Sequence, residues 1–163
     1  MGIFDPSEIF QFAIRIEENG EKFYREMAQK LDDTTVKQLF SALADEEVKH
    51  RKAYQEMVSK IEQYEPFESF PGEYFEYLRA YADNNIFSAD MMKKEMAKID
   101  DPSSALAFAM QRELDSILYY TEAKKLVAEN YRQLIDQIIE EERKHYVKLS
   151  GCKKSTDAAC VSG

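Results

Sequence analysis

Two short stretches, ADEEVKH (Ala44–His50) and IEEERKH (Ile139–His145), determine how the rest of this sequence is interpreted. Each places a glutamate three residues before a histidine, and the chain contains only these two histidines. Residues three apart lie on one face of an α-helix, so each pair presents a carboxylate and an imidazole together. Both stretches lie within long patterns of apolar residues spaced by three and four, which predict amphipathic helices. We therefore expect two helices that each direct a Glu-His pair into a common core.

Two further helical patterns carry a glutamate in the middle of an apolar stripe, without a histidine. These are Glu17 and Glu113, and a tyrosine follows each of them by seven residues, at Tyr24 and Tyr120. Seven residues bring a helix back to within about 20° of the same direction, so each tyrosine shares the face of its glutamate.

The two halves of the chain repeat these positions. Shifting the first pattern by 96 residues and the second by 95 superposes like residues. The matched pairs are Glu17 with Glu113, Tyr24 with Tyr120, Glu47 with Glu142, and His50 with His145. Exposed charges often coincide by chance in helical sequences, whereas agreement at both spacings is much rarer. The repeat predicts two homologous helix hairpins packed about a pseudo-two-fold axis.

The connections between the helices predict the kind of bundle. Short turns join the first two and the last two helices, so each pair forms an antiparallel hairpin. The connection over residues 64–101 is long enough to cross the bundle, and a short helix is expected in it after Ser88. This is the all-α, ferritin-like four-helix bundle, with one domain over residues 1–150. The expected helices span about residues 7–31, 34–63, 102–128 and 130–149. Gly151 is expected to cap the last helix, and residues 151–163 to form a flexible tail.

Composition excludes several classes of function. The chain has 31 acidic and 22 basic residues, a net charge of -9, which repels phosphate backbones and argues against nucleic-acid binding. It lacks the long apolar run of a membrane span and the pattern of a signal peptide. Cys152 and Cys160 both stand near the end of the chain, where they cannot link the helices, so a cytoplasmic location is expected.

Four glutamates in one core require neutralisation, because a buried carboxylate without a partner is strongly destabilising. The stripes contain no lysine or arginine, which leaves protonation or divalent cations. Two divalent cations balance four carboxylates, and two neutral imidazoles complete the ligands. Such a mixed set suits iron or manganese, with zinc as a further alternative. The candidate ligands are Glu17, Glu47, His50, Glu113, Glu142 and His145.

Tyr24 and Tyr120 allow two interpretations. They are either ordinary core aromatics or hydrogen-bond donors to carboxylates that bridge the metals. Since both recur at the same step from a candidate ligand, we expect them to be donors. The neighbouring glutamates are expected to be solvated, namely Glu18, Glu46, Glu140 and Glu141.

These motifs resemble those of the rubrerythrin family of ferritin-like di-iron proteins. The resemblance spans about residues 8–149 and rests on four stretches, IEENGEKFY (Ile16–Tyr24), ADEEVKH, QRELDSILYY (Gln111–Tyr120) and IEEERKH. It implies that Glu47 and Glu142 bridge two irons, that Glu17 and His50 complete one iron, and that Glu113 and His145 complete the other. It also implies reduction of hydrogen peroxide at the diferrous site and a homodimer. The residues expected to serve the reaction are Glu47, Glu142, Tyr24 and Tyr120.

The chain departs from typical rubrerythrins at two places. Ser116 stands where the family carries an additional glutamate that takes part in a redox-linked iron shift. The chain also has two cysteines, too few for the Fe(Cys)₄ centre of a rubredoxin domain. A separate, rubredoxin-like electron-donor protein is therefore expected.

The same ligands also suit other functions. The main alternative is a ferroxidase that uses dioxygen for iron storage or detoxification. Storage requires a hollow multimeric shell. Two further alternatives are a protein stabilised by a redox-inert metal and an oxygenase with an apolar pocket beside the metals.

The crossover is rich in aromatic residues, which either seal one face of the bundle or form a subunit interface. They are Tyr64, Phe67, Phe70, Tyr74, Phe75, Tyr77, Tyr81 and Phe87.

Overall fold

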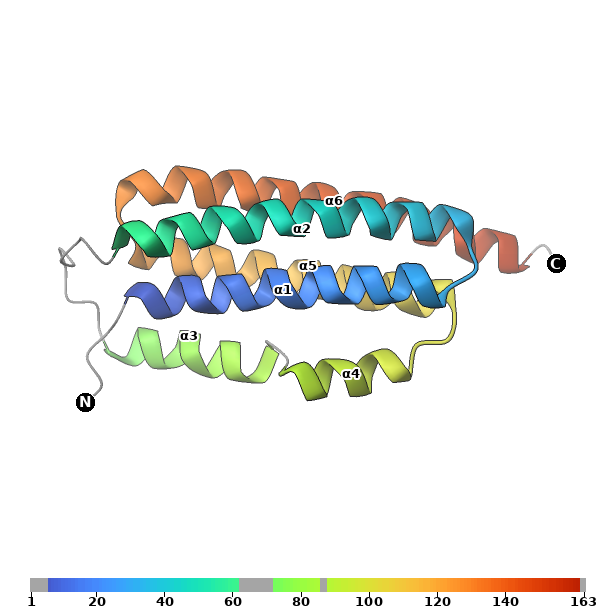
Figure 1. Ribbon diagram of the computed structural model, residues 1–163, viewed down its shortest axis with the longest axis horizontal. Helices are drawn as coiled ribbons and strands as arrows, with labels where there is room; N and C mark the ends of the chain where they lie inside the picture. Colours follow the sequence, from blue (N-terminus) through green and yellow to red (C-terminus); the bar gives the residue numbers. More distant parts are fainter. Residues whose placement is uncertain (1–5, 62–71, 86–87, 162–163) are drawn as a thin grey trace.

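Four long helices form the body of the molecule in the computed structural model, which describes residues 6–61, 72–85 and 88–161. α1 packs against α2, and α5 against α6, as two antiparallel hairpins (Figure 1). The bounds are α1 (Pro6–Lys30), α2 (Thr34–Ile61), α5 (Pro102–Ala123) and α6 (Glu129–Val161). This confirms the predicted all-α, ferritin-like bundle. Within the described ranges, no helix is both long enough and apolar enough to cross a membrane.

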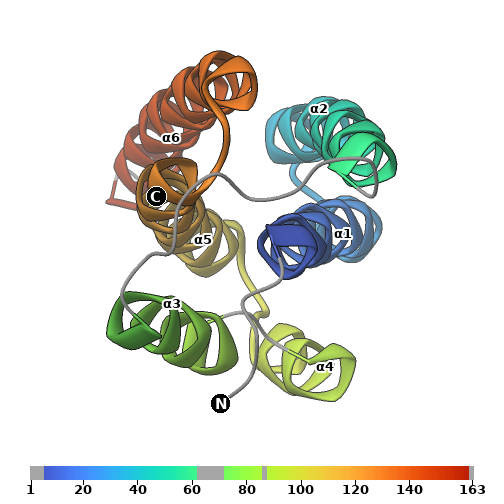
Figure 2. The same ribbon diagram turned by 90° about the vertical axis from the view of Figure 1, so that its left-hand side faces the viewer.

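The crossover carries two short helices along one side of the bundle. α3 (Gly72–Asn85) packs on α5, and α4 (Ala89–Ala97) packs on α1 (Figures 1 and 2). The sequence predicted only α4, whose N-cap Ser88 accepts a hydrogen bond from the Met91 backbone N–H. α3, which begins at Gly72, was not predicted from the sequence, because a Pro-Gly pair is more typical of a turn than of a helix start.

Capping residues start the helices near the predicted positions. Asp33 accepts a hydrogen bond from the Val36 backbone N–H at 2.9 Å, and Asp101 accepts one from Ser104 at the same distance. The third long helix ends earlier than predicted, since the short 3₁₀ helix η1 (Lys124–Leu126) follows α5 directly. Residues 62 and 63, which the second predicted helix included, lie outside the described residues.

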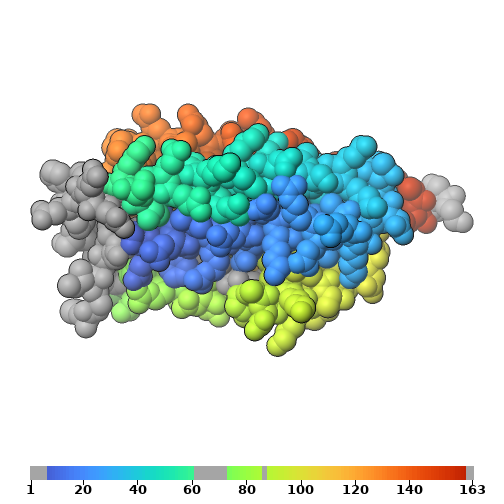
Figure 3. All heavy atoms as spheres, viewed as in Figure 1, coloured from blue at the N-terminus to red at the C-terminus, as the bar shows by residue number. Residues whose placement is uncertain are grey.

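The last helix differs from the prediction most clearly. α6 continues through Gly151 to Val161, where a flexible tail was expected, and its end projects beyond the bundle (Figures 1 and 3). Gly151 lacks the positive φ of a C-cap glycine. Asp157 stabilises the extension by accepting hydrogen bonds from Ser103 and Lys153, both at 2.6 Å, and Cys152 packs against the core.

A polar layer at mid-length divides the core into two apolar clusters. Each long helix contributes apolar side chains to both clusters and polar ones to the layer between them. Phe10, Tyr54 and Ile135 belong to one cluster, and Phe40 and Leu106 to the other. The buried polar residues of the described chain are Glu17, Glu47, His50, Glu113, Ser116, Glu142 and His145. The apolar clusters therefore anchor the helices on both sides of a layer that is unfavourable to bury.

Part of the aromatic crossover seals the bundle. Tyr74, Phe75 and Tyr81 pack against the core, whereas Tyr77 is half exposed. The other four aromatic residues, Tyr64, Phe67, Phe70 and Phe87, lie outside the described residues.

Replacing Gly151 with alanine is expected to stabilise the protein by roughly 0.5–1 kcal/mol, because glycine weakens a helix interior. An added methyl group meets nothing within 4 Å at this position. Chemical denaturation of the two proteins measures the difference. A loss of stability would show instead that Gly151 ends the helix in a left-handed conformation.

Candidate metal centre

Six side chains from the four long helices converge in the polar layer. Their candidate ligand atoms form two overlapping groups, and within each group all atoms lie within 4.8 Å of one another. One group holds Glu17, Glu47, His50 and Glu142, and the other Glu47, Glu113, Glu142 and His145. Glu47 and Glu142 belong to both. The arrangement therefore fits two neighbouring cations that share two carboxylates and have one histidine each.

The two histidines face this centre with Nδ1. His50 Nδ1 lies 2.8 Å from Glu142 Oε1 and 3.4 Å from Glu17 Oε2. His145 Nδ1 lies 3.4 Å from Glu142 Oε2 and 3.6 Å from a carboxylate oxygen of Glu113. The imidazole rings stack with their centroids 5.6 Å apart. Each Nδ1 therefore faces carboxylate oxygens of its own candidate ligand group.

Unsatisfied polar atoms test whether metal ions fit here. Four buried atoms of the centre make no well-directed hydrogen bond with any described residue, although His50 Nδ1 lies within ion-pair distance of two of the others. They are Glu17 Oε2, His50 Nδ1, Glu142 Oε1 and His145 Nδ1. A buried polar atom without a partner is destabilising by about 1–3 kcal/mol, and more when it is charged. Divalent cations would satisfy the oxygens and the imidazole nitrogens together. The residues present therefore fit a two-metal site.

Outer carboxylates hold the far side of each imidazole. His50 Nε2 lies 2.6 Å from Glu141, and His145 Nε2 lies 2.5 Å from Glu46, in each case across the two hairpins. A carboxylate at one ring nitrogen orients the ring and leaves the other nitrogen for a metal. Both glutamates were predicted to be solvated. Glu141 is exposed, with 52% of its side chain accessible, whereas Glu46 is partly buried at 32%, and each contacts a histidine that the prediction did not include.

The internal repeat could have indicated a role for these two glutamates, because Glu46 and Glu141 occupy matching positions, each directly before a candidate ligand. Glu18 and Glu140, also expected to be solvated, are exposed.

The tyrosines contact different carboxylates from those expected. The Tyr24 hydroxyl donates a hydrogen bond to Glu113, and the Tyr120 hydroxyl donates one to Glu17. These are the unshared glutamates of the opposite hairpin, whereas the sequence predicted donation to the bridging pair. The reason is that α1 and α5 run in opposite directions (Figure 1), so each tyrosine lies beside the other helix's glutamate. Burial, followed by the neighbouring carboxylates, raises the pKa of both hydroxyls and keeps them protonated.

In the absence of metal, the centre retains protons. Burial and the charge of Glu142 raise the pKa of Glu47 and Glu113. Burial lowers the pKa of the histidines, but the carboxylates around them outweigh it, and the pKa rises to about 12 for His50 and about 10 for His145. Metal ions must therefore displace protons from this centre, so their affinity rises with pH through the neutral range.

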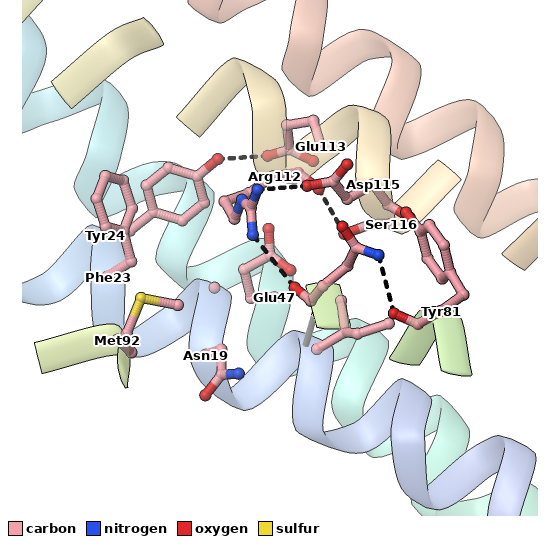
Figure 4. A pocket seen from close by; sticks show the side chains of 13 residues that line it. Asn19, Phe23, Tyr24, Glu47, Tyr81, Met92, Arg112, Glu113, Asp115 and Ser116 are labelled. Atoms are coloured by element: carbon pink, nitrogen blue, oxygen red, sulfur yellow. Dashed lines mark hydrogen bonds and ion pairs between the residues drawn. The ribbon is translucent and has the colours of Figure 1, made fainter. Parts of the chain in front are cut away.

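A small cavity reaches the centre from the side that α3 and α4 cover. Glu47, Glu113 and Ser116 stand in its wall (Figure 4). Gly20 also lines it. Ser116, where the family's additional glutamate would be, donates a hydrogen bond to the Arg112 backbone carbonyl at 2.9 Å.

Comparison with known families agrees with this geometry. A family model described as rubrerythrin matches residues 8–153. The chain belongs to the rubrerythrin family. This rubrerythrin-family chain is also similar to a crystal structure from Thermotoga maritima, described as a ferritin-like diiron-carboxylate protein, with 27% identity and a TM-score of 0.67. The match covers 94% of this chain and 97% of the other. Among curated proteins nothing matches. Family membership and the buried cluster together fit a di-iron protein.

Glu46→Ala and Glu141→Ala are each expected to weaken metal binding by about 10- to 100-fold, because each removes the carboxylate that orients a histidine. Titration of the metal-free protein with Co(II), followed by visible absorbance, measures the affinity. Glu140→Ala is the matched control, since this exposed glutamate pairs only locally with Arg143 at 3.1 Å. Equal effects in all three variants would contradict the assignment.

Proposed function

We propose that the protein reduces hydrogen peroxide at a di-iron centre held by the six converging residues. The observation that carries the proposal is the pair of overlapping ligand groups, each with one histidine, which share Glu47 and Glu142. When bound there, two ferrous ions would supply the two electrons that, with two protons, convert one hydrogen peroxide molecule into two water molecules. Iron is favoured because carboxylate and imidazole ligands suit it and because the family is known for di-iron members.

The protein's own side chains prepare the site for this reaction. Glu47 and Glu142 belong to both ligand groups and would hold both ions, and an outer carboxylate orients each histidine. The hydroxyl groups of Tyr24 and Tyr120 remain protonated and donate hydrogen bonds to the unshared glutamates. The apolar clusters on either side exclude bulk water, which strengthens the electrostatic interactions inside the layer.

Reducing equivalents would come from a separate, rubredoxin-like protein, because the two cysteines of the chain are too few for an Fe(Cys)₄ centre. We further propose that the protein works as a cytoplasmic homodimer.

Stopped-flow absorbance separates peroxide reduction from ferroxidase activity. The protein is loaded with Fe(II) without oxygen and mixed in parallel with hydrogen peroxide and with dioxygen. Peroxide is expected to oxidise the iron at least about tenfold faster, without growth of a mineral, and Glu142→Ala to lose this reaction because it removes a shared ligand. Faster oxidation by dioxygen, with iron accumulating beyond two per chain, would favour ferroxidase and storage instead.

A further inference from the structure

The cavity beside Glu47 and Glu113 has a size that restricts what can reach them. Its volume is about 50 Å³, which holds only a few water-sized molecules. Its wall includes side chains of α1 and α5 from the bundle and of α3 and α4 from the crossover. It is therefore a small, defined space between the candidate metal ligands and the covered side of the bundle.

Direct contacts between α3 and α5 hold the outer wall of the cavity in place. The Tyr81 hydroxyl donates a hydrogen bond to the Asp115 backbone carbonyl at 3.0 Å. Arg112 of α5 donates one to the Asn85 backbone carbonyl of α3 at 3.2 Å. Within α5, an ion pair with Asp115 at 2.6 Å helps to hold the Arg112 guanidinium. Moving α3 away from α5 to widen the cavity would break these two hydrogen bonds, so this side of the wall is held in place.

Gly20 provides the space on the inner side. A methyl group at this position would lie 3.2 Å from Glu47 Cδ and 3.3 Å from its Oε2, a tight contact that would displace the Glu47 side chain by a few tenths of an ångström. Gly20 lies inside α1 without a positive φ, so the backbone conformation does not require glycine. Glycine weakens a helix interior relative to alanine. What glycine provides at this position is therefore open space beside the Glu47 carboxylate.

The second half of the chain has a small residue at the matching position. A shift of 96 residues places Gly20 on Ser116, and both line the cavity, one from α1 and one from α5. Ser116 is buried and its hydroxyl is engaged with the backbone of its own helix. The two matching positions therefore leave room on both sides of the space in front of Glu47 and Glu113.

We propose that this cavity is the access route for the oxidant and that Gly20 and Ser116 are specificity-determining residues. They leave room for hydrogen peroxide, which has two heavy atoms, whereas the fixed outer wall excludes hydroperoxides with bulky organic groups. The inference rests on the proposed di-iron function, because it assumes that the oxidant must reach Glu47 and Glu113.

Azide binding tests the route without measuring peroxide reduction. Gly20→Ala and Ser116→Val narrow the cavity from opposite walls, and Gly151→Ala is the matched control because its methyl group meets nothing within 4 Å. Each protein is loaded with iron, oxidised and titrated with sodium azide, with the affinity read from the charge-transfer absorbance. Both cavity variants are expected to bind azide about tenfold or more weakly, with two irons per chain retained, while the control is unchanged.

Three results would overturn the proposal. The first is unchanged azide affinity in both cavity variants. The second is loss of iron from Gly20→Ala with unchanged azide affinity in Ser116→Val, because Gly20 would then position Glu47 rather than open a route. The third is equally fast oxidation of the wild-type ferrous protein by cumene hydroperoxide and by hydrogen peroxide.

The route and the function can fail separately. Weaker azide binding in both cavity variants, together with no peroxide reaction in any of the proteins, would support the route and contradict the proposed function.

Discussion

Four carboxylates buried in one layer repel one another and lose their hydration, and the rest of the bundle is organised around that constraint. Glu17, Glu47, Glu113 and Glu142 lie between two apolar clusters that fix the helices on either side. Protons on the layer reduce the repulsion in the metal-free protein, but they leave four buried atoms without a well-directed hydrogen bond to the described residues. Cations remove both problems at once, which makes metal binding and folding parts of one equilibrium.

The contacts that orient the ligands pass from one hairpin to the other. Tyr24 reaches Glu113 and Tyr120 reaches Glu17, while His50 and His145 reach outer carboxylates on the opposite hairpin. Each contact has a counterpart related by the internal repeat. The centre therefore depends on how the two hairpins dock, and neither hairpin alone contains a complete ligand group. The crossover helices contribute differently, by forming part of the wall of the cavity.

Residues that face the core along one helix were predictable from spacing, because helical periodicity places them without knowledge of the partner helix. This was enough to identify the bundle and the six residues that converge. Contacts between helices were not predictable in the same way. Glu46 and Glu141 precede ligands by one residue and reach across to the other hairpin, and the tyrosine partners follow from the antiparallel offset of α1 and α5. Gly151 was ambiguous because a glycine suits a helix end as well as an extension held by tertiary contacts.

Anomalous diffraction from iron-loaded crystals, recorded on both sides of the iron absorption edge, tests the central claim most directly. The account predicts two iron peaks in the polar layer, both in contact with Glu47 and Glu142, one beside His50 and the other beside His145. A single peak, or iron bound away from this layer while the six side chains pair only with one another, would contradict it.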